Sequence, residues 1–289
     1  MPYNISEEEI IRRTKEAIDR GATEVCLQGG IHPKFSGETY LDIVRAIRSV
    51  SDSIHIHAFS PLEIDHGRKT LNISVKDFLI ELKNVGLNSL PGTAAEILHD
   101  DIRAIICPDK LNSNEWVEII KAAHSVGLPT TSTMMFGHVE NMSHVAHHLI
   151  RLLEIQNSTN GLTEFVPLPF VAEEAPIFRR GKSRPGPTFK ETILVHSVAR
   201  ILYNGSINNI QGSWVKMGLP GLKYLLSSGI NDIGGVLMNE SITRSAGASF
   251  GQELNLDDVL TIIDELGLNL KQRNTLYHSL TNDIQEVIN

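Results

Sequence analysis

One pattern recurs along the chain: an amphipathic helix, a glycine, a short apolar strand, and then glycine or polar residues. Its first copy has a helix over 6–20, Gly21, and a strand over 24–28 that runs into Gly29 and Gly30. The glycine after the helix suits the left-handed residue that ends many helices. Helices that alternate with short strands in this way predict an α/β fold with a parallel sheet.

The later copies of the pattern extend it over nearly the whole chain. They place strands at 54–59, just before Pro91, and at 130–135, 162–166, 207–211 and 234–238. The helices fall at 39–50, 75–84, 115–125, 143–155, 188–203 and 220–226, and two more follow at 256–266 and 270–288. Seven strands in one constant order are typical of a (β/α)8 TIM barrel. Because the chain opens on a helix, we expect a barrel without its first strand, or alternatively an open doubly wound sheet.

The composition agrees with a single barrel domain over 1–289, with C-terminal helices from about 255. A chain of 289 residues suits one barrel. The net charge of -8 and the scattered Lys and Arg argue against a nucleic-acid surface. No apolar run has membrane-spanning length, and the N-terminus lacks the apolar core of a signal peptide. We therefore expect a cytoplasmic protein with no membrane or nucleic-acid partner.

Polar and glycine residues follow several predicted strands, at the end where parallel α/β folds place their chemistry. Gly29 and Gly30 let a ligand approach the bare backbone, or form a plain turn. His138 and Glu140 suit acid–base work, or form a polar pair at a helix start. Further residues expected to line the mouth are Thr93 and Glu96, which also have capping-box spacing, and Gln211, Ser213, Asn239 and Glu240.

A metal-dependent hydrolase barrel is a second hypothesis. His55 and His57 lie two residues apart on a strand, so their side chains share one face. Such a pair can bind zinc if another histidine and an aspartate join it, and His138 and Asp232 are candidates. Two inward histidines that hydrogen-bond to barrel neighbours explain the same residues without a metal. The sequence predicts no metal ligand set.

Several segments, in order along the chain, resemble a known enzyme family. They are GATEVCLQGGIHP (21–33), HIHAFSPLEI (55–64), SLPGTAAEIL (89–98), TSTMMFGHVEN (131–141), EFVPLPFV (164–171), EEAPI (173–177), RPGPTFKE (184–191), SWVKMG (213–218) and GGVLMNESITRSAGA (234–248). Together they resemble the radical S-adenosylmethionine (SAM) enzymes that transfer a 4-hydroxybenzyl (4-hydroxyphenyl) group in deazaflavin (FO, coenzyme F-420) biosynthesis. Menaquinone-pathway (futalosine) radical SAM enzymes share the barrel and are an alternative, but 89–98 and 184–191 favour the FO family.

The resemblance implies a radical SAM type (β/α)8 barrel and a transferase reaction. In the family a [4Fe–4S] cluster and SAM generate a radical that cleaves L-tyrosine, and the hydroxybenzyl fragment joins 5-amino-6-(D-ribitylamino)uracil. It also implies a partner FO synthase subunit that acts on the product, and an electron donor. SAM is expected at Gly29, Gly30, Thr93, Glu96, His138 and Glu140, and the substrates at Gln211, Ser213, Asn239 and Glu240. No residue is assigned as the catalytic group.

The sequence departs from the family pattern in its cysteines. The family holds its cluster with three cysteines in one loop after the first strand, and that motif is absent from this chain, as is the strand. Cys26 and Cys107 are the two cysteines, too few for a thiolate-bound cluster or a disulfide framework. Ala172 and Phe250 stand where histidines are expected. A truncated, non-catalytic fragment is therefore a further alternative, and the chain by itself is expected to be inactive.

Overall fold

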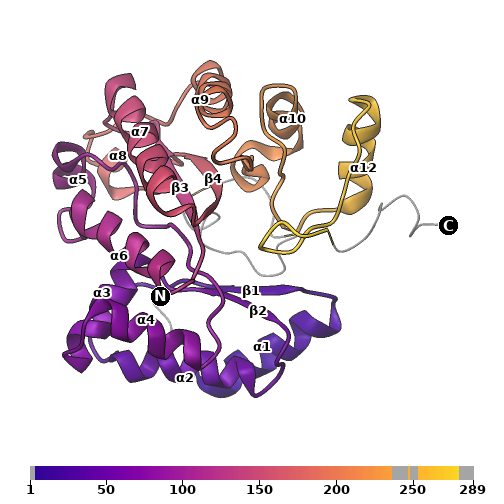
Figure 1. Ribbon diagram of the computed structural model, residues 1–289. Helices are drawn as coiled ribbons and strands as arrows, with labels where there is room; N and C mark the ends of the chain where they lie inside the picture. Colours follow the sequence, from indigo (N-terminus) through magenta and orange to yellow (C-terminus); the bar gives the residue numbers. More distant parts are fainter. Residues whose placement is uncertain (1–3, 236–246, 248–252, 280–289) are drawn as a thin grey trace. The chain divides into compact units, whose positions relative to one another are not determined.

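The structure is a computed structural model that describes residues 4–235, 247 and 253–279 (Figure 1). The chain divides into two compact units. The first contains residues 1–94 and 114–131, and the second contains 95–113 and 132–289. Within the described residues, no helix combines the length and the apolar character needed to cross a membrane.

The first unit is a parallel sheet covered by helices. Strands β1 (Glu24–Leu27) and β2 (His55–Ala58) pair in parallel, and single parallel bridges extend the order from His57 to Ser89 and from Leu90 to Thr130. Figure 1 shows helices α1, α2 and α4 together on one side of the β1–β2 pair. The helices of this unit are α1 (Glu7–Asp19), α2 (Gly37–Arg48), α3 (Pro61–Leu71), α4 (Val75–Asn84) and nearly all of α6 (Ser113–Ser125).

The second unit continues the same helix-and-strand order. It contains β3 (Thr130–Phe136) from residue 132 on, which pairs with β4 (Leu162–Pro169), and parallel bridges join Phe165 to Ile210 and Gln211 to Asp232. Helices α7, α9 and α10 pack against β4. The helices of this unit are α5 (Asp100–Ile106), α7 (Met142–Thr159), α8 (Pro176–Arg179), α9 (Phe189–Leu202), α10 (Trp214–Leu226) and α12 (Leu256–Glu265).

Local sequence explains where these helices begin and end. Ser6 and Ser74 start α1 and α4 by accepting a hydrogen bond from the backbone N–H three residues on. Asn72 and Asn160 end α3 and α7 in the left-handed conformation, which asparagine tolerates better than most residues. The apolar faces between these ends are buried, and full burial of a large apolar side chain stabilises by about 1.5–3 kcal/mol. Fully buried examples are Ile56, Phe78, Phe136 and Phe165.

Three helices were not expected, and two predicted elements are not found in the part of them that the structure describes. Helices α3, α5 and α8 occupy segments that the sequence pattern left without structure. The helix predicted over 270–288 is absent from 270–279, where the Asn274 side chain accepts the N–H groups of Leu276 and His278 and folds the chain into a turn. The last strand pairs at Asp232 rather than at 234–238, and residues 233–235 are unpaired. The remaining residues of both predictions lie outside the described residues.

Candidate functional site

The loop after β1 offers backbone groups to a ligand. The N–H of Gly29 donates to Glu63 Oε1 at 3.1 Å. A Cβ added to Gly30 would meet no atom within 4 Å, so the space beside it is open. Within the described part of the chain, no protein group donates to the carbonyl oxygens of Gln28, Gly29 or Gly30. These oxygens are therefore free to accept hydrogen bonds from a bound cation or from water.

The end of β2 is built around the carboxylate of Glu63. Ser60 caps α3, and its backbone N–H and hydroxyl donate to Glu63 Oε2 at 2.8 and 2.7 Å. Glu63 is buried, and burial raises its pKa although three donors favour the ionised form. Phe59, the residue before the cap, has a left-handed φ of 67°. Glu63 was not among the site residues expected from the sequence, although the S-x-x-E spacing of a capping box marks it.

Thr93 lies just after Ser89 and Leu90, the two residues that bridge to His57 and Thr130 in the first unit. Its carbonyl accepts a hydrogen bond from the Trp116 indole at 3.0 Å, and Gly92 donates to Thr131 Oγ1 at 2.9 Å. The Thr93 hydroxyl is buried and has no hydrogen-bond partner within the described residues. A buried hydroxyl without a partner costs free energy, so a ligand that bonds it is favoured.

The capping-box interpretation of Thr93 and Glu96 is wrong. No helix starts between them, because Glu96 has a left-handed φ of 46° and α5 begins only at Asp100. In the second unit the Glu96 carboxylate pairs with Lys110 at 2.7 Å, and its backbone oxygen accepts from Met135 N–H at 2.9 Å. Glu96 thus fastens its own loop to the end of β3.

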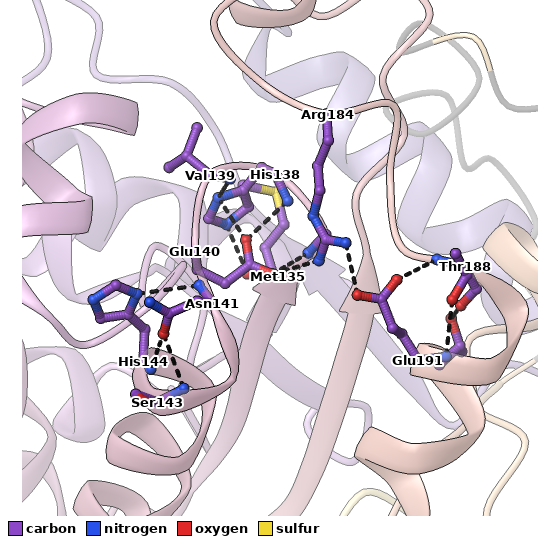
Figure 2. A network of polar contacts seen from close by, with 12 residues as sticks. Met135, His138, Val139, Glu140, Asn141, Ser143, His144, Arg184, Thr188 and Glu191 are labelled. Atoms are coloured by element: carbon purple, nitrogen blue, oxygen red, sulfur yellow. Dashed lines mark hydrogen bonds and ion pairs between the residues drawn. The ribbon is translucent and has the colours of Figure 1, made fainter.

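His138 and Glu140 form a sealed polar pair in the loop between β3 and α7 (Figure 2). His138 Nε2 donates to the Met135 carbonyl at 2.9 Å, and Nδ1 accepts the Val139 N–H at 2.8 Å. The ring is therefore the neutral Nε2–H tautomer, in keeping with a pKa that burial lowers. The 3.0 Å approach of Nδ1 to Glu140 is consequently not an ion pair. The His138 side chain is buried and both of its ring nitrogens are occupied, so these contacts favour the polar-pair hypothesis over the acid–base hypothesis.

Glu140 holds the loop from the inside. Its carboxylate accepts the N–H groups of Gly137 and His138 at 2.6 and 2.8 Å, and its side chain is fully buried. Burial raises the pKa of Glu140, and the hydrogen bonds from these two amide donors act in the opposite direction. The guanidinium of Arg184, in the long segment before α9, lies 3.3 Å from Glu140 and 2.6 Å from Glu191 (Figure 2). Arg184 is a second functional candidate that the sequence analysis missed.

Gln211 belongs to a charged cluster of the second unit. Its amide donates to Glu164 Oε2 at 3.3 Å. From the C-terminal segment, Tyr277 donates its hydroxyl to Glu164, and Arg273 pairs with Asp232 at 2.5 Å. Burial, first of all, raises the pKa of the Tyr277 phenol, and Glu164 adds to that effect. The distant position of Arg273 and Tyr277 in the sequence explains why they were missed.

Two of the remaining residues singled out in the sequence lie in described parts of the chain. Ser213 starts α10 without a side-chain cap, and Ala172 is buried. Asn239, Glu240 and Phe250 lie outside the described residues.

The two histidines of β2 share one hydroxyl. His55 Nε2 and His57 Nδ1 each lie 2.7 Å from Ser89 Oγ. His138 is occupied as described, and Asp232 pairs with Arg273. Throughout the residues that the structure describes, no group of three or more His, Cys, Asp or Glu has a metal-binding arrangement. The contacts therefore favour hydrogen-bonded barrel histidines over a hydrolase zinc site.

Comparison with known proteins decides the family. Residues 1–152 match the Radical SAM superfamily, and residues 159–286 match the CofH/MqnC C-terminal region. A 5-amino-6-(D-ribitylamino)uracil–L-tyrosine 4-hydroxyphenyl transferase of Methanothermobacter thermautotrophicus is 45% identical over 278 residues, which cover 96% of this chain and 76% of the relative. This chain belongs to the FO synthase 4-hydroxyphenyl transferase family of radical SAM proteins.

Two further likenesses support the family and the fold. An FO synthase of Mycobacterium leprae is 45% identical over 275 residues, which cover 95% of this chain but 32% of that longer protein. The methylornithine synthase PylB matches in structure with a TM-score of 0.64 and 16% identity over 92% of this chain and 74% of its own. The predicted radical SAM type TIM-barrel fold is thereby confirmed.

The two cofactors of the family fit these residues unequally. The open Gly29–Gly30 backbone and the unpartnered Thr93 hydroxyl suit the polar groups of SAM. The [4Fe–4S] cluster does not fit, because the chain has two cysteines and a cluster needs at least three ligands from one site. Cys26 belongs to the first unit and Cys107 to the second, and neither forms a disulfide within the described residues.

Proposed function

We propose that this protein is the transferase that joins the 4-hydroxybenzyl group of L-tyrosine to 5-amino-6-(D-ribitylamino)uracil. The observation that carries the proposal is the identity of 45–48% over 95–96% of the chain with transferases named for these substrates. The open backbone at the end of β1 supports it, since it offers acceptors where a parallel barrel places its chemistry.

SAM is the cofactor in this proposal, and it supplies the 5′-deoxyadenosyl group for radical chemistry when bound. The Gly29–Gly30 loop receives the methionine ammonium through backbone carbonyls, and the Thr93 hydroxyl provides a further polar contact. Glu96, His138 and Glu140 remain predicted SAM neighbours. The Glu96 side chain pairs with Lys110, His138 bonds to the Met135 carbonyl, and Glu140 accepts backbone amides. In the proposal these residues shape the loops of the SAM site. No step is assigned to an iron–sulfur cluster on these residues.

The substrate contacts are proposed at Gln211, Ser213, Asn239 and Glu240. Their mostly neutral polar groups suit an uncharged ribityl-uracil better than a phosphorylated substrate, which would need a glycine-rich cradle with Lys or Arg. The partner is proposed to be the FO synthase subunit that acts on the product, and the compartment the cytoplasm.

Calorimetric titration tests the substrate assignment without any turnover. In the presence of millimolar SAM, the purified chain should bind 5-amino-6-(D-ribitylamino)uracil and L-tyrosine, each saturably. Gln211→Ala should weaken the binding of 5-amino-6-(D-ribitylamino)uracil by about tenfold, as expected for the loss of one or two hydrogen bonds. Lys223→Ala, which removes an exposed ion pair with Glu265, is the matched control.

The alternatives predict other outcomes. Preferential binding of a futalosine-type nucleoside would move the protein to the menaquinone pathway. Zinc-dependent hydrolysis that is lost in a His55→Ala variant would replace the radical proposal with a hydrolase. A chain that binds neither SAM nor either substrate would be a non-catalytic fragment.

A further inference from the structure

One buried carboxylate connects the ends of two neighbouring strands. Glu63 Oε1 accepts the N–H of Gly29, 34 residues away in the sequence, while Oε2 accepts the backbone N–H and the hydroxyl of Ser60. Only 4% of the residue is exposed. Removing a carboxylate from water is costly, and hydrogen bonds from three donors offset that cost here.

Helix capping alone does not explain this arrangement. In a capping box the glutamate carboxylate accepts one hydrogen bond from the N-cap N–H. The Ser60 N–H already makes that bond with Glu63 Oε2. The corresponding Glu191 of α9 closes its own box with Thr188 while its side chain stays 23% exposed. At Glu63, burial and the additional bond to Gly29 go beyond what α3 requires. The second oxygen therefore serves the loop after β1.

The chain is strained where it turns from β2 into α3. Phe59 has a φ of 67°, in the left-handed region that costs a side-chain-bearing residue about 1 kcal/mol or more. Its N–H still donates to the Leu27 carbonyl at 3.3 Å, so pairing with β1 continues up to the turn. The turn brings Ser60 and Glu63 beside Gly29.

The bond to Gly29 fixes the direction of one carbonyl group. In a trans peptide, the C=O of residue 28 points opposite to the N–H of residue 29. Because Glu63 holds the Gly29 N–H on its own side, the Gln28 carbonyl points away from Glu63. No described group donates to that carbonyl. Next to it, the position of a Gly30 Cβ is open space.

We propose that Glu63 is a positioning residue: it fixes the peptide between Gln28 and Gly29 so that the Gln28 carbonyl faces the ammonium group of an amino-acid-bearing cofactor. This inference rests on the proposed function, in which the Gly29–Gly30 loop receives the ammonium of SAM. Glu63 acts through the peptide and does not touch the cofactor.

Two variants of the same capping box separate positioning from helix stability. Glu63→Ala removes the bond to Gly29 together with the glutamate half of the capping box, the bonds from the Ser60 N–H and hydroxyl. Ser60→Ala removes the serine hydroxyl, and with it the side-chain cap, but leaves the Gly29 and Ser60 N–H bonds to Glu63. SAM is titrated to millimolar concentration against labelled protein, and the backbone amide signals of Gly29 and Gly30 are followed. Amide exchange of Gly29 and the melting temperature are measured on the same samples.

In wild type, saturable shifts of the Gly29 and Gly30 signals are expected. Glu63→Ala should weaken SAM binding about tenfold and speed Gly29 amide exchange, since the loop must be ordered at binding. Ser60→Ala should lower the melting temperature by a similar amount. It should change the affinity for SAM less than about twofold, which is a smaller effect than the loss of one hydrogen bond. Equal weakening in both variants, or unchanged affinity in Glu63→Ala, would overturn the positioning role. No binding to wild type would instead overturn the proposed cofactor site, and the inference with it.

Discussion

His196 shows at the scale of one residue how burial decides protonation. It lies fully buried in α9, where Nδ1 donates to the Thr192 carbonyl at 2.7 Å and Nε2 has no partner among the described residues. Burial lowers its pKa to about 4. His148 in α7 is buried to the same degree and accepts the Leu98 N–H, and its pKa falls to about 3. Both rings are neutral in the folded protein.

These histidines predict a loss of stability in mild acid. A folded-state pKa below the unfolded value of about 6.5 means that the unfolded chain binds the proton first. The contribution of His196 is fully present above pH 6.5 and is lost as the pH falls towards 4. In wild type, His196 should lower the free energy of unfolding by up to about 3 kcal/mol between pH 6.5 and pH 4. The variant His196→Gln should lack this decrease. Urea unfolding at pH 7 and pH 4 measures it, and an unchanged pH slope would contradict the assignment.

At the scale of elements, the long segment before α9 packs against the loop after β3. Gly137 has a φ of 99°, and a Cβ there would lie 2.2 Å from Cδ of Pro187. The Arg184 N–H donates to the His138 carbonyl at 3.0 Å, while its side chain joins Glu140 to Glu191. Steric fit, a backbone bond and charge therefore act together at this contact.

Gly137→Ala should lower the free energy of unfolding by more than the strain of a left-handed alanine backbone accounts for. Gly181→Ala is the matched control, because Gly181 has a φ of 67° with open space around it. The control should cost about 1 kcal/mol, and Gly137→Ala about 2–4 kcal/mol, since the methyl group also forces the loop away from Pro187. Chemical denaturation measures both, and equal losses would show that the contact is looser than described.

A second element contact ties the C-terminal segment to β4 and its neighbours. Arg273→Ala removes the partner of Asp232 and a neighbour of Glu164, both of which stay largely buried. An uncompensated buried charge costs several kcal/mol, and because Arg273 is about one quarter exposed we expect about 2–3 kcal/mol. Lys223→Ala, from an exposed pair, should cost less than about 1 kcal/mol. Thermal unfolding measures both variants, and equal losses of stability in Arg273→Ala and Lys223→Ala would contradict this prediction.

At the scale of the whole molecule, the family chemistry and the cysteine content of this chain disagree. The fold and the relatives belong to radical SAM enzymes, whose cluster requires thiolate ligands. The 289 residues include Cys26 and Cys107, of which one is exposed on β1 and the other is buried. Burial raises the pKa of the Cys107 thiol, which disfavours the thiolate that iron binds.

This chain should therefore hold no [4Fe–4S] cluster after anaerobic reconstitution. Iron and sulfide analysis should find far less than one cluster per chain, and Cys26→Ser should not change the result. With no cluster, the same sample should form no 5′-deoxyadenosine from SAM and dithionite. A stoichiometric cluster would show that ligands other than three cysteines hold it.

The sequence by itself determined the succession of helices and strands, because the period of apolar residues and the capping residues act locally. The helix that starts after Ser6, the left-handed Gly21 that follows it, and the helix at 75–84 are found as predicted. It also marked the strand-end glycines, and its motifs identified the family.

Only the tertiary structure decided which polar groups are occupied. The pairing of Glu96 with Lys110, of Arg184 with Glu140, and of Arg273 with Asp232 joins residues that are 14, 44 and 41 positions apart in the chain. The same holds for the bond from Glu63 to Gly29. Hydrogen bonds and burial depend on distances in space, and local spacing carries no record of them.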